Sequence, residues 1–168
     1  MRRALLVAIP VLGMGIIFQT SIVSRMILLS GNADLILLIL AAWGLQERSQ
    51  GAWVWGIAAT LLVGMASGIP WYIYLIGYMA VVGMARLLMN RIWQAPLLAM
   101  FAVTLTGTLG MLMLMFIERT FLEVPLTIGA VFSQIVLPSI LLNLLLAIPV
   151  HALIRSLVNR LYPEEVNA

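Results

Sequence analysis

The segment LPSILLNLLLAIPVHALIRSLVNRL, residues 137–161, decides the fold class of this chain. Leucine and isoleucine dominate it, yet it contains Asn143, His151, Pro138 and Pro149 and ends in spaced arginines. In a soluble core an unpartnered asparagine is costly, and an internal proline breaks a helix. Inside a bilayer, neighbouring helices satisfy the polar groups that such residues expose. The segment therefore indicates a membrane-spanning helix.

The composition of the whole chain indicates an integral membrane protein. Of its 168 residues, 64% are hydrophobic and 9% are charged, and the mean hydropathy is +1.14. A soluble domain has about a quarter of its residues charged, so this chain cannot cover its own surface in water. The absence of cysteine excludes disulfides and thiolate metal sites. The net charge of +3 reflects arginines at the ends of spans, so we expect no nucleic-acid partner.

Apolar runs separated by charged or turn residues predict about six transmembrane helices in a single all-α membrane domain, residues 1–168. A span takes about 20 apolar residues. The charge-free run 51–85 would be about 52 Å long as one helix, so we expect it to fold back at Ser67–Pro70. Asp34 is expected at the N-cap of the second span, and Pro138 is expected to break or kink the last one. The predicted spans are 4–24, 33–45, 51–67, 70–88, 92–117 and 126–154.

The arginines predict that both termini lie in the cytoplasm. With six spans and the N-terminal run retained as the first span, Arg25 and Arg119 lie outside, and seven arginines lie inside. These seven are Arg2, Arg3, Arg48, Arg86, Arg91, Arg155 and Arg160. The tryptophans are expected at the membrane surfaces, with Trp43, Trp53, Trp55 and Trp93 at inner ends and Trp71 at an outer end.

The ionisable residues predict no catalytic, cofactor or metal site. All six acids lie at or beyond the predicted span ends, whereas functional intramembrane carboxylates lie within spans. They are Asp34, Glu47, Glu118, Glu123, Glu164 and Glu165. His151 is the one histidine and has no second ligand at helical spacing. An intramembrane hydrolase with Ser67 as nucleophile lacks an assignable base, so a turn is the better interpretation of that serine.

Small and polar residues at helical spacing are the candidates for helix packing or for a partner interface. Small residues let helices approach closely, and polar ones hydrogen-bond across the contact. The candidates are Gly64 and Gly68 in the third span, Ala102, Thr106 and Gly110 in the fifth, and Ser139 and Asn143 in the last. Ser139 and Asn143 lie one turn apart on one face, and we expect them to be buried. Packing within the chain and docking of a partner remain alternative uses of each set.

Several stretches resemble, in the same order, the family of the rod shape-determining protein MreD. The last segment, with Leu137-Pro138-Ser139, Asn143, Pro149 and terminal arginines, is similar to the C-terminal signature of that family. FQTS at 18–21 closes the first span in the same manner. GNADL at 31–35 resembles the family's Arg-Pro-Asp-Leu turn, with asparagine and alanine replacing arginine and proline. LLVGMASG at 61–68 resembles its third-span stretch, with Gly64 where an acid is often found, and Gly77-Tyr78 precedes Gly83 and Arg86.

The resemblance implies a non-enzymatic membrane scaffold of the cell-elongation complex, or elongasome, which supports peptidoglycan synthesis and rod cell shape. It implies a multi-pass protein of the bacterial inner membrane that binds MreC, with MreB, RodA and a class B penicillin-binding protein in the wider complex. Membrane lipid and a second copy of the chain are further expected partners. The implied fold is similar to that of the substrate-binding subunits of energy-coupling-factor transporters.

The alternative function is that of such a transporter subunit, which would bind a vitamin or another small solute. It requires a closed polar cavity in the outer half of the bundle. The residues available for such a cavity are Gln19, Ser21, Asn32, Gln134 and a few tyrosines.

Overall fold

The structure, a computed structural model, describes residues 2–25, 28–47, 49, 51–89, 95–121 and 128–162. Within these residues the chain is an all-α bundle, which confirms the predicted fold class. Several residues used in the predictions lie outside the described residues, as do the predicted span starts at 92 and 126. They are Arg48, Arg91, Trp93, Glu123, Glu164 and Glu165.

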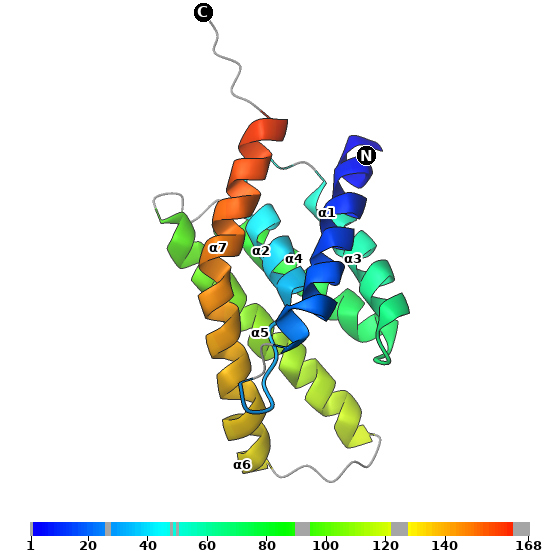
Figure 1. The fold of residues 1–168 in the computed structure, drawn as a ribbon, viewed down its shortest axis with the longest axis vertical. Helices are drawn as coiled ribbons and strands as arrows, with labels where there is room; N and C mark the ends of the chain where they lie inside the picture. Colours follow the sequence, from blue (N-terminus) through cyan, green and yellow to red (C-terminus); the bar gives the residue numbers. More distant parts are fainter. Residues whose placement is uncertain are drawn as a thin grey trace, which may run out of the picture.

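The helices follow the order of the apolar runs. They are α1 (Arg2–Ser21), α2 (Leu35–Gly44), α3 (Ala52–Ala66), α4 (Trp71–Met89) and α5 (Pro96–Phe121), with a short 3-10 turn, η1 (Val23–Arg25), after α1. The last helical segment is continuous and consists of α6 (Ile128–Val131), the π-helical turn η2 (Phe132–Val136) and α7 (Leu137–Leu161). The start of α1 and the end of α7 lie at the same end of the bundle (Figure 1).

Four of these segments are long and apolar enough to cross a membrane, whereas α2 and α3 are shorter. The long ones are Leu5–Arg25, Trp71–Met89, Pro96–Phe121 and Phe132–Leu161. The expected fold-back is confirmed, because α3 ends at Ala66 and α4 begins at Trp71. The chain is therefore built like a membrane protein, with two helices that differ from ordinary spans.

The short helix α2 forms the centre of the bundle. It packs against α1, α3, α4, α5 and α7, and every residue from Ile36 to Gly44 is buried. Figure 1 shows it in cyan between α7 and α1. Its 10 residues give a length of about 15 Å, roughly half of the 30 Å hydrocarbon core of a bilayer. A helix that is apolar on all sides belongs in such an enclosed position.

Two tryptophans form the aromatic centre of this core. The rings of Trp43 in α2 and Trp55 in α3 stack with centroids 3.8 Å apart at an interplanar angle of 17°, and both side chains are fully buried. Each lies near the end of its helix, as expected, but both are enclosed by protein and so do not contact lipid as surface anchors would. Trp53 and Trp71, by contrast, are 52% and 61% exposed.

Of the two forms predicted at Pro138, a break or a kink, the structure excludes the break. The helical segment runs without interruption from Ile128 to Leu161, and its irregularity is the π turn η2, which ends two residues before the proline. A π turn inserts one residue into the helical repeat and so accommodates a ring that ordinary α geometry would push against the preceding carbonyl. The proline therefore widens the helix and does not end it.

Candidate functional site

The loop between α1 and α2 lies along the continuous segment 128–161. The backbone N–H groups of Ser30, Asn32 and Asp34 donate to the carbonyl of Gln134 in η2 at 3.0 Å and, in α7, to Ser139 Oγ at 3.0 Å and to Asn143 Oδ1 at 2.8 Å. Ser30 lies in a turn that the hydrogen bond from the Gly31 N–H to the Leu28 carbonyl closes. The three donors thus pair with one side of this helical segment.

Pro138 makes the first of these bonds available. Proline has no N–H, so the carbonyl four residues earlier loses its helical donor. That carbonyl belongs to Gln134, and it accepts the N–H of Ser30 instead. The presence of Pro138 in the sequence predicts that the carbonyl of Gln134 is a free acceptor. The structure shows that the α1–α2 loop of the same chain donates to it.

Gly31 allows the loop to approach α7 closely. A Cβ atom at this position would lie 2.6 Å from both Pro138 Cβ and Ser139 N. Real side chains do not reach such distances, so any other residue would push the loop away from the helix. The absence of a side chain is therefore a condition for the neighbouring hydrogen bonds.

Gln19 of α1 holds the other side of the loop. Its Nε2 donates to the carbonyl of Ala33 at 2.7 Å, and its Oε1 accepts the N–H of Leu35 at 2.8 Å. A single amide side chain thus satisfies one acceptor and one donor of the backbone. With α7 on one side and Gln19 on the other, the loop is held against the bundle, with Gly31 and Ala33 buried and Ser30 and Asn32 exposed.

Asp34 begins α2 and joins it to α4 and α5. Its Oδ1 accepts the N–H of Leu37 at 2.9 Å, which confirms the predicted N-cap, and its Oδ2 accepts the hydroxyl of Tyr78 at 3.4 Å. Asn143, which accepts the N–H of Asp34, donates through Nδ2 to Thr108 Oγ1 at 3.0 Å. The carboxylate therefore joins α2 to α4, and the N–H of Asp34 is linked through Asn143 to α7 and α5.

Asp34 lies at the end of α2, in line with the prediction that every acid lies at or beyond a span end. Its partners Tyr78 and Asn143, and Thr108 beyond Asn143, lie in the interior of α4, the continuous segment 128–161 and α5, several turns from either end. The end of α2 is deep in the bundle because α2 is a half-length helix. Irregular backbone at such depth occurs only where protein encloses it.

Arg86 fixes the opposite end of α2. Its guanidinium donates to the carbonyl of Gln46 at 3.3 Å, to Ser49 Oγ at 2.9 Å and to the carbonyl of Ser49. Ser49 Oγ in turn donates to the carbonyl of Trp43 at 2.7 Å. Tyr78 and Arg86 both belong to α4, so this one helix holds α2 at its first and last turns.

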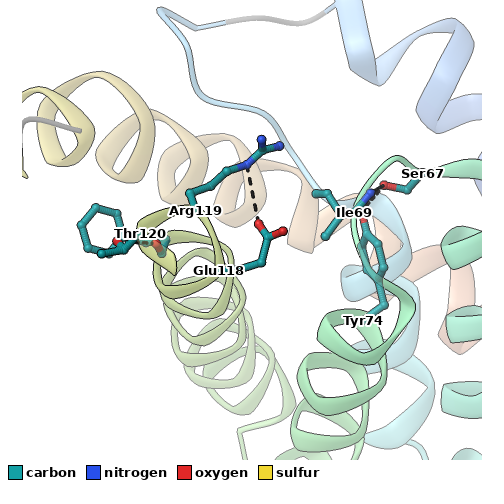
Figure 2. Close-up of polar contacts among 7 residues, drawn as sticks. Ser67, Ile69, Tyr74, Glu118, Arg119 and Thr120 are labelled. Atoms are coloured by element: carbon teal, nitrogen blue, oxygen red, sulfur yellow. Dashed lines mark hydrogen bonds and ion pairs between the residues drawn. The ribbon is translucent and has the colours of Figure 1, made fainter. Parts of the chain in front are cut away.

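The turn between α3 and α4 is closed by its own polar groups. Ser67 Oγ accepts the N–H of Ile69 at 3.2 Å and is hydrogen-bonded to Tyr74 Oη at 2.7 Å. Figure 2 shows this pair, and it also shows Glu118 beside Arg119 at the end of α5, where Arg119 Nε lies 3.7 Å from Glu118 Oε2. The hydroxyl of Ser67 thus serves the turn, in line with its interpretation as a turn residue.

The glycines of the third span have separate surroundings. Gly64 lies in α3, where an added Cβ would be 3.0 Å from Trp71 Cβ, so it packs against the start of α4. Gly68 follows the end of α3, lies in the exposed turn and has open space around it. The two residues therefore do not form one helix face.

The stripe on α5 is divided between interior and surface. Ala102 is half-buried, whereas Thr106 and Gly110 are exposed, and a Cβ on Gly110 would meet nothing within 4 Å. The hydroxyl of Thr106 donates to the carbonyl of Ala102 at 2.7 Å. Gly107, one residue further, is the position that faces the core, where an added Cβ would lie 2.7 Å from Val81 Cγ2. The outer face of α5 thus carries the small residues Thr106 and Gly110, and the hydroxyl of Thr106 is satisfied within its own helix and lies 2.9 Å from Met84 Sδ of α4.

Ser139 and Asn143 are buried, as expected, with 2% and 1% of their surface exposed. Their side chains bind the loop of their own chain, so they belong to the interior. Gln19, Gly31, Asp34, Tyr78 and Arg86 also belong to this site but were not among the helix-packing candidates, although Gln19 was considered for a solute cavity and Asp34 was predicted as an N-cap. Polar side chains within apolar runs, at Gln19 and Tyr78, are the signal that identifies them.

Comparisons with protein-family models, with curated proteins and with solved structures gave no match. The geometry of the chain itself is therefore the basis for the functional proposal.

Proposed function

We propose that this chain is a non-enzymatic scaffold subunit of the bacterial cell-elongation complex, related to MreD. It resides in the inner membrane with both termini in the cytoplasm and binds the transmembrane helix of MreC. MreB, RodA and a class B penicillin-binding protein belong to the wider complex, in which the scaffold supports peptidoglycan synthesis and rod cell shape.

The observation that carries this proposal is the meeting of the stretches that resemble the family. Gln19, Asp34, Tyr78 and Asn143 come from four such stretches, and all of them contact the α1–α2 loop or the start of α2. Arg86, from the same stretch as Tyr78, holds the other end of α2. Residues that are far apart in the sequence thus all hold α2 and the loop before it in place. This shared role supports the proposed relation to the family.

The outer face of α5 offers a docking surface for a partner helix. Thr106 and Gly110 are exposed on it, and Met113, one turn further, is 66% exposed. Because Thr106 hydrogen-bonds within its own helix, the face presents no unsatisfied polar group to lipid. Small residues on such a face let a second helix approach closely.

The test is co-purification of MreC with the variant Gly110→Leu, together with restoration of rod shape in cells that lack the chromosomal copy. We expect the bound MreC to fall about tenfold or more, because a large side chain in a close helix contact costs about 1–3 kcal/mol. The matched control is Gly13→Leu in α1, another helical glycine whose added Cβ would meet nothing within 4 Å. It should retain MreC and cell shape.

Two outcomes would contradict the proposal. The first is that Gly110→Leu and Gly13→Leu bind MreC and restore shape equally well, which would remove α5 as the docking face. The second is concentration-dependent stabilisation of the purified protein by a vitamin, because a ligand that binds only the folded state raises its stability with concentration. That result would favour the transporter subunit.

A further inference from the structure

A groove of about 820 Å³ opens between the start of α5 and the final turns of α7. Ile148, Ala152, Arg155 and Asn159 line it from α7, at the spacing of three and four that defines one helix face. Leu97 and Leu98 line it from α5. The groove lies apart from the loop and the Asp34 cluster, at the end of the bundle where α1 begins and α7 ends (Figure 1).

A buried histidine faces this groove without a partner. His151 lines it, is only 4% exposed, and neither of its ring nitrogens has a hydrogen-bond partner among the described residues. A buried polar group that lacks a partner is costly. Both ring nitrogens are enclosed by protein, so the ring forms part of the groove wall and offers no exposed N–H to an occupant.

The walls of the groove change from polar to apolar with depth. Arg155 and Arg160 are exposed near the end of α7, and the exposed fractions of Leu97, Leu98 and Ile148 are 46%, 61% and 50%. Ile148 precedes Arg155 by seven residues, so it lies about 10 Å deeper along the helix. Cations at the mouth and hydrocarbon below match the order of groups in a phospholipid.

We infer that this groove binds an anionic phospholipid of the leaflet at this end of the bundle. Arg155 and Arg160 contact the phosphate, and an acyl chain lies against Ile148, Leu97 and Leu98. The arginine distribution predicts that this end is cytoplasmic, where anionic lipids are enriched, and basic pockets between transmembrane helices are typical sites for their headgroups.

The experiment is a titration of the detergent-purified full chain with phosphatidylglycerol, followed by native mass spectrometry, with phosphatidylcholine as the neutral comparison. We expect one tightly retained phosphatidylglycerol. In the double variant Arg155→Gln/Arg160→Gln its apparent affinity should fall about 25-fold, since each arginine near an anionic headgroup contributes roughly a factor of five. Arg25→Gln, which removes a single charge outside the groove, should leave the retention unchanged.

A second pair of variants tests the groove itself without altering charge. Ala152→Trp fills the groove, whereas Leu153→Trp places the same ring on the adjacent, 70% exposed position outside it. Only the first should displace the lipid. Equal retention of both lipids, or equal retention by both tryptophan variants, would overturn the inference. Full displacement by millimolar inorganic phosphate would also overturn it, in favour of a soluble anion. None of these results depends on MreC, so this inference and the scaffold proposal can fail separately.

Discussion

At the residue scale, Gly31 has the tightest surroundings of the α1–α2 loop. An alanine Cβ would lie 2.6 Å from Pro138 Cβ and Ser139 N, so Gly31→Ala must separate the loop from α7. We expect the free energy of unfolding of the purified protein to fall by about 1–3 kcal/mol. The control Gly13→Ala has open space and gains helix propensity, which is worth up to about 1 kcal/mol. A Gly31→Ala protein as stable as Gly13→Ala would show that the loop is not tightly docked.

Asn143 supports a second prediction at this scale, because it bridges the N–H of Asp34 and the hydroxyl of Thr108. Asn143→Leu leaves a buried backbone donor without a partner, and we expect a loss of about 1–3 kcal/mol in the free energy of unfolding. Thr108→Val in the same background should cost less than it does alone, because its partner is already gone. A double-mutant cycle measures this coupling, expected at about 0.5–3 kcal/mol. Strict additivity would contradict the bridge.

At the element scale, the continuous segment 128–161 carries an acceptor for the loop because of one proline. Pro138→Ala restores an N–H that competes with Ser30 for the carbonyl of Gln134. We expect faster hydrogen exchange at the amides of Ser30 and Asn32, with little change in α3. Pro149→Ala, made in the same helix but further from the loop, is the control. Unchanged exchange at Ser30 would show that the loop does not depend on this acceptor.

The central helix α2 shows how an element can be fixed mainly by its neighbours. Its N-terminal turn meets Tyr78 and its C-terminal side meets Arg86, both from α4. An isolated helix of ten residues is unstable in water, and most helices derive their stability from packing. The enclosure of α2 on every side therefore explains why so short an apolar helix forms at all.

For the whole molecule, the absence of cysteine allows a direct test of orientation. Single substitutions Thr120→Cys, at the end of α5, and Ser156→Cys, in α7, place one thiol at each end of the bundle. With both termini cytoplasmic, an impermeant maleimide added to intact cells should label position 120, whereas position 156 should react only after permeabilisation. The reverse pattern would invert the predicted topology and move the α5–α7 groove to the outer leaflet.

The sequence was sufficient for the fold class, the turn at Ser67 and the burial of Ser139 and Asn143, because each follows from composition or from the cost of polar groups in lipid. It was not sufficient for the partners of those side chains. Ser139 and Asn143 bind backbone N–H groups more than a hundred residues away in the chain. Every residue except proline carries such a group. The identity of the residues in the loop therefore does not indicate which N–H groups pair with Ser139 and Asn143.

The depth of Asp34 could not be predicted for a related reason. An apolar run of ten residues beside a turn has the same composition whether it is the end of a long span or a complete short helix. Only the position of α4, α5 and α7 around it determines how deep its first residue lies. The same applies to Trp43 and Trp55, whose pattern resembles that of interfacial anchors until their neighbours are known.

The docking of the α1–α2 loop onto the last helix has a consequence for biosynthesis. The N–H of Asp34 and its acceptor on Asn143 are 109 residues apart in the chain, so at about 5–20 residues per second the ribosome needs roughly 5–20 s to deliver the acceptor. During that interval the backbone N–H groups of the loop have no acceptor within the hydrocarbon. The nascent loop must therefore remain at the lipid–water boundary or beside the insertion machinery. Docking of the loop therefore waits until the last helix has been synthesised, and a chain truncated before residue 137 should be degraded faster than one that contains this helix.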